Sequence, residues 1–189
     1  MYFKKKSFGI KNFINLNFYN DVNIYDHLSI DKIFKTQVGK LIKNYFFFSF
    51  IRNPYDWIVS YFWWNLFFHK KNKLIDINKF SQKKINYNFT KFLDEKCYNF
   101  FEWQKNIITS KNVVIEIFKY EDFIDNLRKI KKKLNLNSQK ISIEKIKFKK
   151  LKIKKKILIS KINKNKIIKN GEFFFKNYYV DLDLPSNYK

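Results

Sequence analysis

The sequence predicts an α/β fold with a mostly parallel sheet. Two short apolar runs, 45–51 and 113–118, have the length of strands, and the first is apolar throughout, so we expect it to be buried on both faces. Apolar residues at helical spacing follow each run directly, over 54–69 and 120–134. Strands that alternate with helices are typical of a parallel sheet, because the helix carries the chain back to the start of the next strand. The chain of 189 residues is long enough for a hydrophobic core, so we expect a single domain over 1–189.

The remaining segments are assigned in chain order. Residues 1–26 give no clear pattern, and apolar residues on one face predict a helix over 29–43. Segment 70–86 is rich in lysine and asparagine and is expected to be a polar loop. A helix follows over 90–104. Segment 139–169 alternates isoleucine and lysine, which is compatible with a strand, an amphipathic helix or a disordered basic stretch.

The junction between the first strand and its helix, 45–61, carries the most specific pattern in the chain. Asn53 is suited to cap the helix, and Pro54 falls at the first helical position, where its missing N–H costs nothing. A helix start offers backbone N–H groups to an anion, and Arg52 brings a planar fork of donors to the same place. Ser60 follows Asn53 by nearly two turns, so its hydroxyl lies on the capping face. These features predict a phosphate site.

Segment 52–60, Arg-Asn-Pro-Tyr-Asp-Trp-Ile-Val-Ser, resembles the 3′-phosphate-binding motif of sulfotransferases, which use 3′-phosphoadenylyl sulfate (PAPS). The resemblance implies that Arg52 and Ser60 bind the 3′-phosphate, with Asn53 in the same turn. It also implies a P-loop-like three-layer domain, in which helices flank a central, mostly parallel sheet. The match is strongest over 45–61 and moderate over 112–134.

In the second matching segment, Ile-Phe-Lys-Tyr-Glu-Asp-Phe resembles a strand end at which some members of the family contact adenine. Tyr120 is the residue that matches the contacting tyrosine. An alternative interpretation is a tyrosine that simply packs at the end of a strand. Both interpretations remain open.

The family also has a loop that wraps the 5′-phosphosulfate, and its best match here is Lys6-Ser7-Phe8-Gly9. The resemblance implies that Lys6 neutralises the leaving oxygen, with Ser7 and Gly9 as nucleotide ligands. The threonine–serine pair that closes the family loop is missing, so we expect an N-terminally shortened or degenerate member. A frayed basic terminus is the alternative interpretation of this segment.

Transfer of a sulfuryl group requires a base that accepts the proton of the acceptor hydroxyl, and histidine is the usual choice. His27 lies between the candidate loop and Arg52, in a His-x-Ser segment like that of the glycan-modifying branch of the family. We therefore take His27 and Lys6 as the candidate catalytic residues, with Asp26 or Asp31 orienting the histidine. A histidine with a structural role at a helix start is the alternative.

The formal net charge of +24 is compatible with a nucleic-acid-binding protein. However, lysines are spread along the whole chain, and the abundant residues have AT-rich codons, whereas Gly is 3, Pro is 2 and Ala is absent. We interpret the charge as a consequence of AT-rich composition, and nucleic acid is not an expected partner. The only arginines are Arg52 and Arg128, and we place Arg128 on a solvated helix face.

Two scattered histidines and one cysteine, Cys97, give no ligand set for a metal ion, so no metal site is expected. No uninterrupted apolar run reaches about 18 residues, and no targeting signal is evident, so we expect no membrane span and a cytoplasmic location.

The sequence thus predicts a sulfotransferase that moves a sulfuryl group from PAPS to a hydroxyl, with a carbohydrate as the expected acceptor. One alternative is a non-catalytic relative that binds the nucleotide only, as the degenerate loop suggests. The other is a basic nucleic-acid-binding protein.

Overall fold

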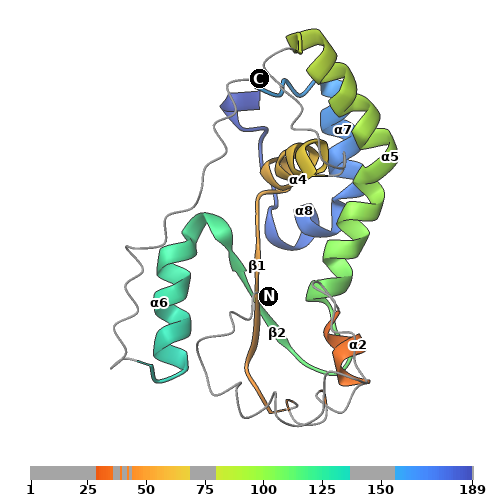
Figure 1. The fold of residues 1–189 in the computed structure, drawn as a ribbon. Helices are drawn as coiled ribbons and strands as arrows, with labels where there is room; N and C mark the ends of the chain where they lie inside the picture. The colour runs from red at the N-terminus through yellow and green to blue at the C-terminus, as the bar shows by residue number, and fades with distance from the viewer. Residues whose placement is uncertain are drawn as a thin grey trace. The chain divides into compact units, whose positions relative to one another are not determined.

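The computed structural model describes residues 29–35, 39, 42, 44–68, 80–136 and 156–188. Figure 1 labels the α-helices and the strands in chain order. Two short 3₁₀ helices, which the figure does not label, are called η2 and η4. The elements are α2 (Ile30–Phe34), β1 (Phe47–Ile51), α4 (Pro54–Phe68), α5 (Gln82–Ile108), β2 (Ile115–Lys119), η2 (Tyr120–Asp122), α6 (Phe123–Lys133), α7 (Lys161–Asn170), α8 (Glu172–Tyr178) and η4 (Ser186–Tyr188).

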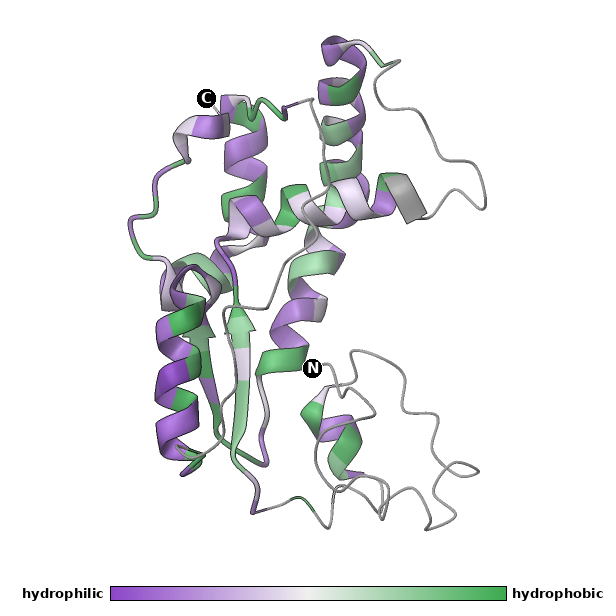
Figure 2. Cartoon of the chain, turned by 60° about the vertical axis from the view of Figure 1, so that its left-hand side comes forward, coloured by the Kyte–Doolittle hydropathy of each residue, from purple (hydrophilic) through white to green (hydrophobic). Residues whose placement is uncertain are grey.

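Strands β1 and β2 are hydrogen-bonded neighbours and run parallel, so the chain is broadly α/β. The sheet has two strands within the described residues, and a three-layer P-loop-like domain stays a prediction. Nearly all of β1 is hydrophobic (Figure 2). We expected this strand to be buried on both faces, but Phe48 is 39% exposed, whereas Phe47 and Ile51 are buried. The expectation of complete burial is therefore wrong, because one face of β1 is only partly covered.

The chain divides into two compact units, and a single domain over 1–189 stays a prediction. The first unit comprises Met1–Ser49 and Gln104–Ile117. In it, Asp31 of α2 accepts hydrogen bonds from the Ser110 hydroxyl and, at 2.8 Å, from the Asn112 side-chain amide. The described helix α2 ends at Phe34, where the Lys35 N–H closes a 3₁₀ turn on the Lys32 carbonyl (3.2 Å), so it is shorter than the predicted helix.

The second unit comprises Phe50–Trp103 and Phe118–Lys189. Its core is aromatic: the Trp57 ring of α4 meets Phe100 of α5 at 5.6 Å and Phe174 of α8 at 5.5 Å, both edge-on. Edge-to-face packing is a favoured arrangement of aromatic rings. Helices α5 and α7 lie side by side (Figure 1). Between them, the Asn163 side-chain amide donates to the Thr90 hydroxyl (2.9 Å).

Helix α5 begins earlier than predicted. The Ser81 hydroxyl accepts the Lys84 N–H (3.2 Å), and buried Ile85 and Phe89 follow at helical spacing. The predicted polar loop is therefore wrong over 82–86, because a serine cap starts the helix there, and residues 69–79 lie outside the described part.

In segment 139–169, the described residues from Lys161 onward form α7, so the helical alternative holds for that part.

Helix α6 ends in an asparagine rather than a glycine. Asn135 has a φ of 53°, its N–H donates to the Lys132 carbonyl (3.1 Å), and the Leu136 N–H donates to the Lys131 carbonyl (3.0 Å). This pair of hydrogen bonds is the Schellman motif, in which a left-handed residue closes the helix. Asp181, which follows α8, also has a positive φ, 59°. Both corners require the left-handed region, which asparagine and aspartate tolerate better than most residues.

Candidate anion-binding site

The corner between β1 and α4 is built by its own residues. The Asn53 side-chain oxygen accepts the Tyr55 N–H (3.0 Å), and the Asn53 carbonyl accepts the Trp57 N–H (2.9 Å). Pro54 occupies the first helical position. The predicted cap, proline position and helix are confirmed. Two residues, Arg52 and Asn53, separate β1 from α4 and form the whole turn.

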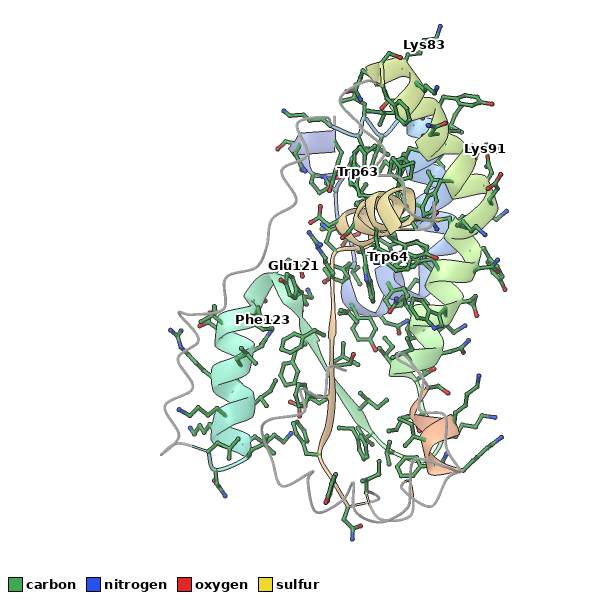
Figure 3. All side chains as sticks on the ribbon, in the orientation of Figure 1. Trp63, Trp64, Lys83, Lys91, Glu121 and Phe123 are labelled. Atoms are coloured by element: carbon green, nitrogen blue, oxygen red, sulfur yellow. The ribbon has the colours of Figure 1, made fainter. Side chains whose placement is uncertain are left out.

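Glu121 joins this corner to the end of β2 (Figure 3). One of its carboxylate oxygens accepts the Asn53 N–H (2.6 Å), and the other accepts the Tyr179 hydroxyl (2.7 Å). Burial, together with the Glu121 carboxylate, raises the pKa of Tyr179, so its hydroxyl remains a neutral donor. The Asn53 N–H is thus engaged within the protein, although we expected the N–H groups of this helix start to be available to an anion.

Arg52 is the cationic group at the corner. Its side chain is 39% exposed, and its Nη2 atom lies 4.0 Å from a carboxylate oxygen of Asp56. Its guanidinium carbon lies 5.8 Å from the centre of the Tyr120 ring, within the range of a cation–π contact. The structure therefore brings together Arg52 and Tyr120, two predicted site residues from the ends of neighbouring strands. Among the described residues, this 4.0 Å contact is the one ion pair of Arg52, and it leaves most of the guanidinium donors for an anion.

Ser60 is exposed on α4. It follows Asp56 by four residues, so these two share one face of α4, and Arg52, in the turn before the helix, reaches that face through its 4.0 Å contact with Asp56. Ser60 lies about 10 Å along the helix axis from Asn53. An anion that contacts both Arg52 and Ser60 would therefore lie along this face, and the Arg52 side chain would extend toward Ser60 to reach it.

The corner carries charges of both signs. The Asp56 carboxylate lies 4.0 Å from Arg52, whereas the Glu121 carboxylate and the Lys119 ammonium both lie against Tyr179. An anion must therefore compete with Asp56 for the guanidinium. With the Asn53 groups engaged, anion binding at this corner would depend on the side chains of Arg52 and Ser60 more than on the helix amides.

An aromatic cluster begins next to Ser60, and we call Tyr61, Trp64, Phe100 and Trp103 the aromatic shelf, in which Phe100 is the buried base. The Tyr61 ring stacks on Phe100 at 4.5 Å and on Trp64 at 5.9 Å. Trp64 is 46% exposed and Trp103 is 38% exposed. Trp63 lies on a different side of α4 and is buried (Figure 3). The shelf thus presents indole rings to solvent one helical turn beyond Ser60.

Several predicted site residues lie outside the described part of the chain: Lys6, Ser7, Gly9 and His27. Asp31, named as a partner for His27, is held by Ser110 and Asn112. Arg128 is exposed and paired with Asp125 (2.6 Å), as expected for a solvated helix face. Within the described residues, no group of three or more histidine, cysteine, aspartate or glutamate side chains could hold a metal ion.

Two tyrosines at this corner had no site role in the sequence analysis. Tyr179 reaches Glu121, and the Tyr188 hydroxyl donates to Asp56 (2.5 Å). Both come from the C-terminal segment, more than 50 residues from their partners, so no local pattern could have placed them. The high density of tyrosine near the C-terminus is a signal for this segment, but it does not name the partners.

Comparisons of the chain with models of protein families, with curated proteins and with solved structures find no match. None of the described helices is both long enough and apolar enough to cross a membrane.

Proposed function

We propose that the protein is a PAPS-dependent sulfotransferase, an enzyme that transfers a sulfuryl group to a hydroxyl of a carbohydrate. The observation that carries the proposal is the arrangement at the β1–α4 corner. Arg52 lies over the Tyr120 ring and contacts Asp56, which shares a face of α4 with exposed Ser60. These are the side chains that the sulfotransferase motif assigns to the 3′-phosphate and the adenine.

In this proposal, the guanidinium of Arg52 forms paired hydrogen bonds to the 3′-phosphate, and the Ser60 hydroxyl donates a further one. The Tyr120 ring provides a flat surface beside the guanidinium, suited to an adenine. Lys6, Ser7 and Gly9 at the phosphosulfate, and His27 as the base, stay predictions from the sequence. Transfer would be in line, with catalysis by positioning and charge neutralisation, as in phosphoryl transfer.

The aromatic shelf supports a carbohydrate acceptor. Sugar rings have apolar faces, and exposed indole rings are suited to cover such faces without desolvating charged groups. Trp64 lies one helical turn from Ser60, so an acceptor on the shelf would lie next to the nucleotide end of α4. Replacing Trp64 with alanine should raise the KM for the acceptor and leave nucleotide affinity unchanged.

The test is calorimetric titration of the full chain with adenosine 3′,5′-bisphosphate. Arg52→Ala should weaken binding by about 10- to 100-fold, as expected for loss of charge-assisted hydrogen bonds, and Ser60→Ala by less. Arg128→Ala is the matched control, because it removes the other arginine, which is exposed and paired with Asp125. Equal affinities for Arg52→Ala and wild type, or equal losses for both arginine variants, would overturn the proposal.

The nucleotide-only alternative is favoured by one observation, the missing threonine–serine pair after Gly9. A transfer assay with PAPS and a panel of glycans distinguishes it from the enzyme, because it predicts binding that depends on Arg52 without turnover. A nucleic-acid-binding protein would instead bind polynucleotides with a steep salt dependence and would be insensitive to Arg52→Ala.

A further inference from the structure

We propose that Tyr188 and Asp56 are positioning residues that keep Arg52 available to an anion. The inference deepens the proposed function and rests on it, because it takes Arg52 as the phosphate ligand. Its basis is a chain of side chains that leads from the C-terminal segment to the guanidinium.

The two oxygens of the Asp56 carboxylate have different partners. Oδ1 accepts the Tyr188 hydroxyl at 2.5 Å, and Oδ2 faces Nη2 of Arg52 at 4.0 Å. The first distance is a short hydrogen bond, whereas the second exceeds the usual range of 2.7–3.2 Å for one. Tyr188 is therefore the stronger partner of Asp56, and Arg52 is paired only loosely.

This division of partners matters because arginine and a carboxylate otherwise form two parallel hydrogen bonds. With Oδ1 directed at the Tyr188 hydroxyl, the Asp56 carboxylate presents only Oδ2 to the guanidinium. Arg52 then keeps its paired donors for a phosphate and still has a nearby negative charge that fixes its direction. Without the Tyr188 hydroxyl, Asp56 is free to rotate and occupy the guanidinium, in direct competition with the anion.

Tyr188 is itself held in place. It is 9% exposed, its carbonyl accepts the Ile159 N–H (2.9 Å), and its own N–H donates to the Pro185 carbonyl (3.0 Å). Burial and the Asp56 carboxylate raise the pKa of the Tyr188 phenol, so the hydroxyl remains a neutral donor at neutral pH. The backbone contacts of Tyr188 do not depend on its hydroxyl, and Tyr188→Phe should keep the segment in position.

The inference makes two connected predictions for affinity. Tyr188→Phe should weaken binding of adenosine 3′,5′-bisphosphate by about 5- to 10-fold, the range expected for a lost hydrogen bond to a charged group. In an Asp56→Asn background, the same change should have no effect, because Tyr188 acts only through the Asp56 charge. Such a loss of effect in the double variant is the signature of coupled residues.

Tyr179→Phe is the matched control. It also removes a C-terminal hydroxyl that donates to a carboxylate, but that carboxylate belongs to Glu121 and does not contact Arg52. The control should lower the melting temperature and leave nucleotide affinity within about twofold of the wild type. Titrations of the wild type, Tyr179→Phe, Tyr188→Phe, Asp56→Asn and the double variant therefore separate a positioning role from general stability.

Three outcomes would overturn the inference: equal affinities for the two phenylalanine variants, an undiminished Tyr188→Phe effect in the Asp56→Asn background, or an unchanged affinity for Asp56→Glu. The last variant leaves Tyr188 intact and extends the carboxylate toward Arg52, so we expect it to weaken binding even if Tyr188→Phe does not fold. Arg52→Ala shows which claim has failed. If this variant loses nucleotide affinity, the proposed function stands, and negative results with the tyrosine variants overturn only the positioning role of Tyr188.

Discussion

Glu121 offers a quantitative test of how the corner is held together. Its carboxylate receives two hydrogen bonds, from the Asn53 N–H at 2.6 Å and from the Tyr179 hydroxyl at 2.7 Å. Hydrogen bonds to charged groups contribute about 1.5–3 kcal/mol each, and the exposure of Glu121 favours the lower end of that range. Glu121→Ala should therefore cost about 3 kcal/mol, or roughly 6–12 °C in melting temperature for a chain of this size.

The measurement is urea unfolding followed by circular dichroism at neutral pH, with the same m-value required for every variant. Glu121→Gln keeps an acceptor for the Asn53 N–H, and we expect it to lose about half as much stability as the alanine variant. The control is Glu95→Ala, which removes an exposed carboxylate 3.7 Å from Lys91 and should cost less than about 0.5 kcal/mol. A loss at Glu121 no larger than the loss at Glu95 would refute the assigned role of the bridge.

Three further predictions concern individual groups. Asn53→Ala should destabilise the chain by about 1 kcal/mol, because the Tyr55 N–H loses its cap, and urea midpoints measure this loss. Burial raises the pKa of the Cys97 thiol to about 12, so a thiol reagent at pH 8 should react roughly 10³-fold more slowly with the folded chain than with the urea-unfolded chain. Hydrogen bonds from Ser110 and Asn112 lower the pKa of Asp31; the stability that Asp31 contributes is thus present above about pH 4 and lost as the pH falls through the lowered pKa. Asp31→Asn should remove this part of the acid dependence of the urea midpoint, and an unchanged dependence would contradict it.

The β1–α4 corner could be predicted from the sequence because every signal in it is local. The apolar run, the capping asparagine and the proline lie within ten residues, and each acts on its immediate neighbours. The start of α5 was missed for the opposite reason. Segment 82–86 is polar overall, which favours a loop. The Ser81 cap and the burial of Ile85 and Phe89, which lie at helical spacing, stabilise a helix there instead.

The site was only partly predictable. Arg52 and Tyr120 follow neighbouring strands, and the carboxyl ends of parallel strands meet at one edge, so a sequence argument can place them together. The C-terminal tyrosines are different: Tyr188 is 132 residues from Asp56, and a tertiary contact over that distance leaves no periodic trace in the sequence. In our proposal, the Tyr188–Asp56 contact orients the carboxylate beside Arg52, and the motif alone does not reveal this partner.

The left-handed corners at Asn135 and Asp181 show how a chain with few glycines makes turns that need a positive φ. Glycine is the usual residue for such corners, and its codons are rich in G and C. A chain with 3 glycines among 189 residues turns at both places with residues whose codons are richer in A and T. The side-chain carbon costs up to about 1 kcal/mol at each corner relative to glycine. With few glycines, the chain thus keeps both turns at the cost of a small part of its free energy of unfolding.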